Sequence, residues 1–318
     1  MKLTESLIIS NYLKKLTFKE KSALELEDDI FYDVKKKIVF SKDTYEENIH
    51  FLNSSAPKKF IKKIFRSSIS DIICKGIAPK VYFLSLSIKK LNNKWLNSFT
   101  KCLREDSKKY GLFLGGGDIV KSKKNSITIS VLGYVTKKPI LRSNAKINDD
   151  IYLTGNLGDS YLGLLVNLEK LKTKDSNYFI NAYQKPDLKY KFSKQMYKFA
   201  NSSIDLSDGL IKDLSSICRS SNCGAILDYD TLPFSSKAKK LFKKNRIKPK
   251  HIFSQGDDYQ ILFTASKKLR GQILLISKKM TTKVTRVGKI VVGKVVKMTS
   301  GNKNMDLSGI KTGFIHRF

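Results

Sequence analysis

Runs of apolar, β-branched residues alternate with amphipathic stretches through the first half of the chain. The apolar runs predict strands, and stretches with apolar positions three and four residues apart predict helices. The expected strands lie at about 37–41, 81–88, 112–114 and 127–135, and the expected helices at about 57–76 and 93–110. Such alternation is typical of an α/β unit.

The same alternation begins again after the segment 135–155. It predicts helices at about 158–170, 188–200 and 209–220, and strands at 203–206 and near residues 225, 260, 285 and 293. A chain of 318 residues is more readily divided into two domains of about 150 residues each than folded around one core. We therefore expect one domain over residues 1–146 and a second over residues 147–318.

The first 18 residues show the pattern of an amphipathic helix. Ser10 and Asn11 interrupt the apolar run, Glu5 adds a negative charge, and no small-residue cleavage site follows. Nowhere does the chain approach the run of about 18 apolar residues that a membrane-spanning helix requires. We therefore expect a cytoplasmic protein with no membrane partner.

The four cysteines and three histidines form no local metal motif. No two cysteines have the spacing CxxC, and the histidines lie far apart in the sequence. Reduced thiols, buried or at the surface, are the simplest interpretation of the cysteines.

The formal net charge is +33, from 61 lysines and arginines against 28 aspartates and glutamates. Lysine clusters such as 239–250 could bind nucleic acid through its phosphates. The lysines are scattered along the whole chain, however, and lack the interleaved arginines and aromatic residues that base recognition favours. Solvated lysine faces are therefore the better interpretation, and no specific nucleic-acid partner is expected.

Five short stretches place carboxylates beside glycine, serine or a chain reversal. They are 25–33, 40–51, 67–79, 115–120 and 204–210. Each stretch alone favours a helix N-cap or a turn, and Asp208 before Gly209 could simply cap the helix expected at 209–220.

Together the five stretches favour a metal site. Carboxylates avoid one another unless a positive charge lies between them, and magnesium prefers oxygen ligands. In "GLFLGGGD" (111–118) a strand runs into three glycines, where backbone N–H groups can approach an anion and Asp118 can hold a metal. Lysine side chains remain an alternative source of the positive charge.

Two other motifs do not fit their patterns. "GKIVVGKV" (288–295) has the spacing of a phosphate-binding P-loop, but Val295 stands where Ser or Thr must contact magnesium, so two strands are favoured. "DLSDGL" (205–210) begins like a calcium-binding EF-hand loop, but Gly209 comes one position early.

The order of the acidic stretches resembles that of the thiamine-monophosphate kinase family, in the superfamily of aminoimidazole ribonucleotide synthetase. "SDIICKGIAP" (70–79) is similar to the family's Ser-Asp-Leu-Ala-Ala-Met-Gly-Ala-x-Pro, and "IDLSDGLIKDL" (204–214) is nearly unchanged from it. Further similar segments are "DDIYLTGNLGDSYLGL" (149–164), "GDDYQILFT" (256–264) and "GFIHRF" (313–318).

The resemblance implies ATP-dependent phosphorylation of thiamine monophosphate to thiamine diphosphate, by direct in-line transfer with magnesium. Such chemistry needs positioning and charge neutralisation more than a covalent nucleophile. It also implies an α/β (α+β) fold. The domain over 1–146 would bind ATP and metal and pair its sheet in a homodimer, and the domain over 147–318 would complete the active-site cleft.

The resemblance also assigns roles to individual residues. The metal-linked positions are Asp29, Ser41, Asp43, Asp71, Asp118, Asp205 and Asp208, of which Asp29, Asp71 and Asp208 are expected to be catalytic. The expected contacts to ATP are Gly117, Asp118, Arg142 and Ser207. The expected acceptor side consists of His50, Asp257 and Phe314.

Several positions depart from the family pattern. Glu27 replaces a glycine, Ile119 a threonine and Asp257 a glutamate. Lys42 replaces a threonine beside the metal positions, where it would neutralise phosphate charge in place of an ion or point away. Two alternatives therefore stay open: a sister enzyme that uses ATP on another acceptor, and a degenerate, non-catalytic basic binding module.

Overall fold

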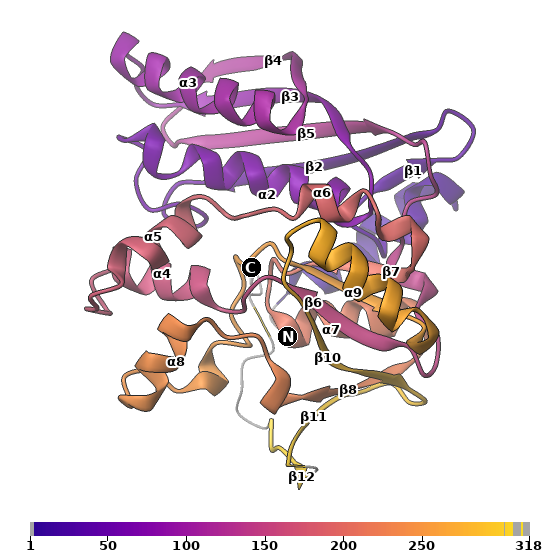
Figure 1. The fold of residues 1–318 in the computed structure, drawn as a ribbon. Helices are drawn as coiled ribbons and strands as arrows, with labels where there is room; N and C mark the ends of the chain where they lie inside the picture. The colour runs from indigo at the N-terminus through magenta and orange to yellow at the C-terminus, as the bar shows by residue number, and fades with distance from the viewer. Residues whose placement is uncertain (1–2, 302, 308–312, 314–318) are drawn as a thin grey trace.

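The computed structural model describes residues 3–301, 303–307 and 313. The strands of this part form two sheets, and Figure 1 shows them one above the other. The upper sheet takes its strands from residues 31–134, and the lower sheet from residues 150–304. The domain division expected at residue 146 falls between these two ranges and stays a prediction.

The upper sheet has five strands in the order β1-β2-β5-β3-β4. Only β3 and β4 are parallel, and the other neighbours are antiparallel. The bounds are β1 Phe31–Asp33, β2 Ile38–Glu46, β3 Pro79–Ile88, β4 Phe113–Lys121 and β5 Ser126–Tyr134. Alternate residues of β5, such as Ile127, Ile129 and Val131, are buried on one face of the sheet.

Helix α2 (Ile61–Cys74) packs against that buried face and is the central helix of the molecule. Twelve of its 14 residues are buried, because it contacts β2 and β5 on one side and β7 and α5 of the other half on the other. A second helix, α3 (Asn93–Tyr110), packs beside α2, begins at the Asn92 cap and ends at Gly111 in the left-handed conformation. The residues that α2 carries therefore face both halves of the chain.

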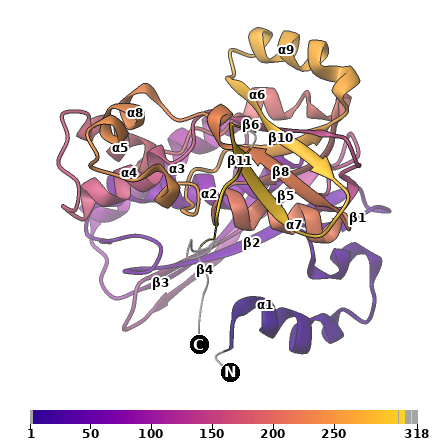
Figure 2. The same cartoon turned by 90° about the horizontal axis from the view of Figure 1, so that it is seen from below.

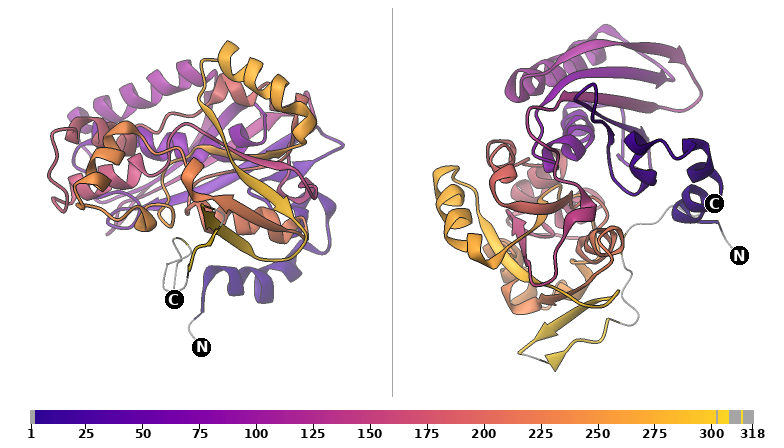
Figure 3. Two further views of the ribbon diagram at one scale, coloured as in Figure 1. Left: turned by 60° about the horizontal axis from the view of Figure 1, so that its bottom comes forward. Right: turned by 90° about the vertical axis from the view of Figure 1, so that its right-hand side faces the viewer.

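The lower sheet has seven strands in the order β12-β11-β8-β10-β6-β9-β7. Their bounds are β6 Asp150–Thr154, β7 Ala200–Asp205, β8 Gly224–Asp228, β9 Ile261–Ala265, β10 Val284–Val291, β11 Val296–Ser300 and β12 Lys303–Asn304. The helices of this half are α4 Asp159–Asn167, α5 Ser176–Gln184, α6 Tyr190–Ser193, α7 Leu210–Ser220, α8 Ser236–Lys243 and α9 Arg270–Lys279. Strands β11 and β12 project from one end of this sheet (Figure 3).

Most of the expected elements are confirmed, including the helices that became α2, α3, α4 and α7. The segment 288–295 ends one strand and turns into the next, as its β-branched residues predicted. The sequence analysis missed β1, β6, β12, α5, α8 and α9. None of the described helices is long and apolar enough to cross a membrane.

The helix expected over 188–200 was wrong. The chain forms only the short helix α6 and a 3-10 turn at Met196–Lys198 before β7 begins at residue 200. Phe192, Met196 and Phe199 are buried together against Phe263 of β9. Their spacing mimics a helix, but they fill a cluster beneath the sheet from an irregular segment.

The N-terminal helix was also only partly right. Helix α1 covers Glu5–Ile8, and a π turn and a 3-10 turn continue to Thr17. None of these residues is buried, and Figure 2 shows the segment at the edge of the molecule. A short helix without a buried apolar face has little to stabilise it.

The three glycines of 115–117 lie inside a strand, which corrects the expected loop. Strand β4 continues through them to Lys121, at the edge of the upper sheet. A Cβ atom at Gly117 would lie 1.8 Å from the backbone oxygen of Leu84. Glycine therefore permits the close approach of β4 to β3 and forms no phosphate-binding turn here.

Candidate active site

A cavity of about 590 Å³ lies where the two halves of the chain meet. Its walls come from β2, α2, the end of β7 and the loop that precedes β9. The expected site residues that line it are Asp29, Ser41, Lys42, Asp43, His50, Asp71, Asp205, Ser207, Asp208 and Asp257. Four of the five acidic stretches therefore meet at one place.

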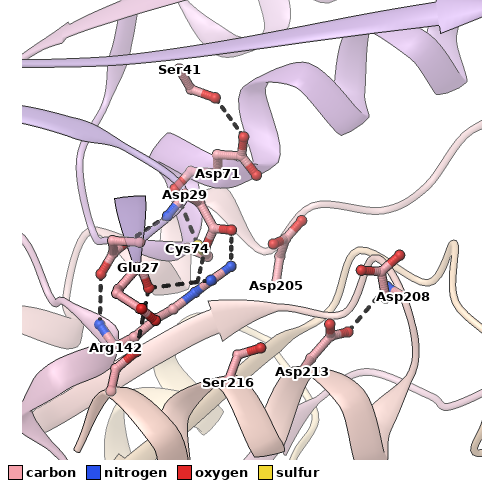
Figure 4. Close-up of polar contacts among 12 residues, drawn as sticks. Glu27, Asp29, Ser41, Asp71, Cys74, Arg142, Asp205, Asp208, Asp213 and Ser216 are labelled. Carbon is pink, nitrogen blue, oxygen red and sulfur yellow. Dashed lines mark hydrogen bonds and ion pairs between the residues drawn. The ribbon is translucent and has the colours of Figure 1, made fainter. Parts of the chain in front are cut away.

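Three carboxylates from different elements face this cavity. Asp43 is on β2, Asp71 is inside α2, and Asp205 is the last residue of β7. Each accepts a hydrogen bond from a neighbouring hydroxyl: Tyr45 for Asp43 at 3.0 Å, Ser41 for Asp71 and Ser70 for Asp205 at 2.7 Å. Figure 4 shows Ser41 pointing to Asp71, with Asp205 across the site.

The three carboxylates resist ionisation. Burial raises the pKa of Asp71 well above its usual range, and the nearby Asp43 and Asp205 carboxylates raise it further. Burial also raises the pKa of Asp43 to about 7 and that of Asp205 above its usual value. Among the residues that the structure describes, none of the three has an ion-pair partner. A bound cation would stabilise their ionised forms, and the described residues supply none within ion-pair distance.

Asp28 and Asp29 are different, because cations already hold them. The Nζ atom of Lys75 lies 2.8 Å from Asp28 and 3.2 Å from Asp29. Arg142 donates through its guanidinium to Asp29 and through its backbone N–H to Asp28. Arg142, an expected ATP contact, therefore reaches the site through Asp29 (Figure 4).

One further grouping has the spacing of metal ligands. A ligand atom from each of Asp29, Cys74 and Asp205 lies within 4.8 Å of the others. Burial raises the pKa of the Cys74 thiol well above its usual value, so the thiol stays protonated. A protonated thiol is a poor ligand for a hard cation, and Asp29 already pairs with Lys75 and Arg142, so of these three groups only Asp205 is left without a cationic partner among the described residues.

Asp208 is not the cap of α7. The cap residue is Gly209, and the buried carboxylate of Asp213 accepts the backbone N–H groups of Asp208 and Gly209 at 3.1 and 3.0 Å. Asp208 is thereby left to face the cavity, where Lys212 pairs with it at 2.6 Å. Gly256 permits this arrangement, because its Cβ would lie 1.8 Å from the oxygen of Ser207.

The expected acceptor residues His50 and Asp257 also line this cavity, and the backbone N–H of Asp257 donates to the backbone oxygen of Ser207 at 2.9 Å. Asp257 accepts hydrogen bonds from Lys63 at 2.8 Å and from Tyr259 at 3.1 Å. Lys63 also donates to the backbone oxygen of His50 at 3.2 Å and lies over the ring of Tyr183. The buried Lys63 therefore connects His50 and Asp257. Phe314 lies outside the described residues.

Gly117 and Asp118 do not reach this cavity within one chain. Asp118 pairs with Ser85 in the register of β4 and β3, and β4 is the third strand from β2. At about 4.8 Å per strand, Asp118 lies about 14 Å from β2. Lys42 lines the cavity but is exposed, and strand alternation places it on the opposite face of β2 from Asp43.

The chain is similar to known proteins along nearly its whole length. Residues 26–135 match the family described as AIR synthase related protein, N-terminal domain. The thiamine-monophosphate kinase of Buchnera aphidicola subsp. Schizaphis graminum is 34% identical over 315 residues, covering 96% of this chain and 94% of that protein. The chain belongs to the thiamine-monophosphate kinase family.

Solved structures agree with this membership. The structure of AaThiL complexed with AMPPCP and TMP matches with a TM-score of 0.85 and 26% identity, over 99% of this chain and 97% of that one. HypE of E. coli, a hydrogenase maturation protein, matches with a TM-score of 0.70 and 15% identity, over 95% of this chain and 97% of that one. The second likeness shows the fold alone. The α/β fold expected from the family resemblance is confirmed.

Sequence reasoning missed several members of this thiamine-monophosphate kinase site. They are Asp28, Lys63, Ser70, Lys75 and Asp213. A signal for the two lysines was present, because both fall within the apolar periodicity of α2 and its end. Lysine within a buried pattern indicates a carboxylate partner.

Proposed function

We propose that this chain transfers the terminal phosphate of ATP to thiamine monophosphate and so forms thiamine diphosphate. The observation that carries the proposal is a set of three carboxylates, Asp43, Asp71 and Asp205, in the cavity of a chain of this family. None of the three has a cationic partner among the residues that the structure describes. The relative AaThiL, with the same fold, was solved with AMPPCP and TMP. This supports a nucleotide and an acceptor as the ligands of the cavity.

Asp43, Asp71 and Asp205 are the residues that would hold magnesium. Their donor set fits this ion, because it consists of oxygen atoms and has an unbalanced negative charge. Magnesium, when bound, supplies the positive charge that offsets repulsion between nucleotide and acceptor phosphates. The chain holds the carboxylates in place through the hydroxyls of Ser41 and Ser70.

Two groups of cavity residues would bind the two substrates. Ser207 and Asp208, held by the α7 turn, form the nucleotide side together with Arg142. His50 and Asp257, joined by Lys63, form the acceptor side. Because these groups come from rigid elements of both halves, they keep donor and acceptor phosphates aligned for direct transfer.

The outer face of the upper sheet is proposed to pair with a second copy of the chain. Large apolar side chains are exposed there, with Phe83 40%, Phe113 55% and Tyr134 56% exposed. Strand β4 forms the free edge beside them and is exposed along its length. Asp118 lies on β4, so pairing would bring it toward the cavity of the second copy rather than its own.

The proposal is tested with the purified protein, magnesium, ATP and one acceptor at a time. Thiamine monophosphate should yield thiamine diphosphate and ADP in equal amounts, whereas thiamine and AMP should yield no phosphorylated product. Equal turnover of an unrelated acceptor would favour a sister enzyme. If the protein binds an acceptor without ATP and forms no product, a binding module would be favoured.

A further inference from the structure

Lys75 is a fully buried lysine at the end of α2, with 0% of its surface exposed. Its ammonium group has three partners: Asp28 at 2.8 Å, Asp29 at 3.2 Å and the backbone oxygen of Ser203 at 2.9 Å. An ammonium group has three N–H donors, so its hydrogen bonding is complete. Lys75 is thus held at a fixed position by groups from both halves of the chain.

Lys75 and Arg142 balance the charge at this edge of the site. Asp28 and Asp29 contribute two negative charges, and Lys75 and Arg142 contribute two positive charges within ion-pair distance. A divalent cation gains little from a group of residues that is already neutral.

The other edge of the site has no such balance. Asp205 is buried, and Asp43 and Asp71 are half-buried. In the part of the chain that the structure describes, none of the three has a cation within 4.0 Å. Lys75 contributes to the field at Asp205 without pairing with it. The site therefore consists of a part around Asp28 and Asp29 whose charges are balanced and a part around Asp71 whose carboxyl groups have no counter-charge.

Packing does not explain a lysine at this position. Its neighbours in α2 are the buried Ile72, Ile73 and Cys74, and an apolar side chain would continue the same surface. The family segment given above has methionine there, which has nearly the same length and no charge. Burying an ammonium group is unfavourable until its partners replace the lost hydration, so an ion pair here is weak support for a purely stabilising role.

We propose that Lys75 is a built-in counter-ion that takes the place of one divalent cation at Asp28 and Asp29. It acts as a positioning residue, because it fixes Asp29 and leaves divalent cations to bind only at Asp43, Asp71 and Asp205. The proposal rests on the proposed function for the use of magnesium. The number of bound cations is nevertheless measured without any turnover.

The test counts bound Mn²⁺, a substitute for magnesium with an electron paramagnetic resonance signal, in Lys75→Met and in the wild type. Lys75→Met is expected to bind one more ion per chain, and Mn²⁺ should raise its thermal midpoint more than that of the wild type. Lys62→Met is the matched control, because Lys62 lies on the same helix but pairs with Glu105 at the surface. It should bind the wild-type number of ions.

An equal number of ions in Lys75→Met and the wild type would overturn the proposal. Should Lys75→Met not fold, Asp28→Asn provides the second test. It leaves Lys75 with surplus charge, so Mn²⁺ affinity at the remaining site should fall about tenfold. An unchanged affinity would also overturn the proposal. If the wild type is an active kinase but Lys75→Met binds no extra ion, only the role of Lys75 is refuted. If Lys75→Met binds an extra ion but the wild type shows no turnover, only the proposed function is refuted.

Discussion

The hydroxyl of Ser70 donates a hydrogen bond of 2.7 Å to the carboxylate of Asp205, across 135 positions of sequence. Ser70 is on α2 in the first half of the chain, and Asp205 ends β7 in the second half. Both side chains are buried, and the next residue along α2 is Asp71. The bond therefore sets the position of Asp71 relative to Asp205 at the point where the two halves meet.

Asp71→Asn is expected to lower turnover by at least about a hundredfold, because it removes charge that would hold the cation in the transition state. Without magnesium the variant should be as stable as the wild type or more stable, because the replaced carboxyl is buried among others. Initial rates and thermal midpoints, each measured with and without magnesium, check both expectations. A wild-type rate at saturating magnesium would contradict the role given to Asp71.

Magnesium binding is expected to depend on pH through Asp43, whose pKa burial raises to about 7. The folded protein binds this proton more tightly than the unfolded chain, so the stabilisation is complete below about pH 4 and is lost as pH rises to about 7. Magnesium competes with the proton, so its affinity should rise as pH increases through about 7.

Calorimetric titration of magnesium in buffers of different ionisation enthalpy measures the protons released on binding. Near pH 6 we expect at least about one proton per ion, because burial raises the pKa of both Asp43 and Asp71. Asp149→Asn is a suitable control, because Asp149 bonds Asn201 and lies outside the cavity. An affinity that stays constant between about pH 5.5 and about 7.5 would exclude a protonated ligand.

Asp257→Asn is expected to raise the KM for thiamine monophosphate about tenfold to a hundredfold and to leave the KM for ATP within about twofold. The change removes the negative charge that Lys63 pairs with and leaves only an amide oxygen as the acceptor, which weakens a contact worth about 1.5–3 kcal/mol. Steady-state kinetics with each substrate varied in turn separate the two effects. Equal increases in both KM values would mean that Asp257 does not belong to the acceptor side alone.

Phe83→Glu is expected to convert a dimer into a monomer, because it places a charge on the proposed pairing face of the upper sheet. Leu275→Glu is the matched control on α9, where Leu275 is 70% exposed. Light scattering during size-exclusion chromatography gives the mass directly. A wild-type chain that is already monomeric at micromolar concentration would contradict the dimer.

The elements that could be predicted from the sequence are those whose apolar spacing matches one face of a helix or strand. Helices α2, α3 and α7 have such faces, and the motif at 204–210 does end a strand at the site. The segment 188–200 has the same spacing, yet its aromatic residues fill a cluster from an irregular chain path. Periodicity alone does not distinguish the two cases.

The parts of the site that could not be predicted depend on tertiary pairing. Asp118 shares a motif with glycines, but the register of β4 places it at the far edge of the sheet. Lys75 was one lysine among many in a basic chain, and only its burial against Asp28 and Asp29 sets it apart. The spacing of residues along the chain does not reveal the order of strands in a sheet or which side chains are buried.

The most direct test of the account follows the γ-phosphate itself. ATP labelled with ³²P at the γ position is incubated with magnesium, thiamine monophosphate and either the wild type or Asp71→Asn, and the products are separated by chromatography. The account predicts that the wild type places the label in the terminal phosphate of thiamine diphosphate and that Asp71→Asn does so at least about a hundredfold more slowly. Label recovered only as inorganic phosphate, or equal transfer by both proteins, would contradict the account.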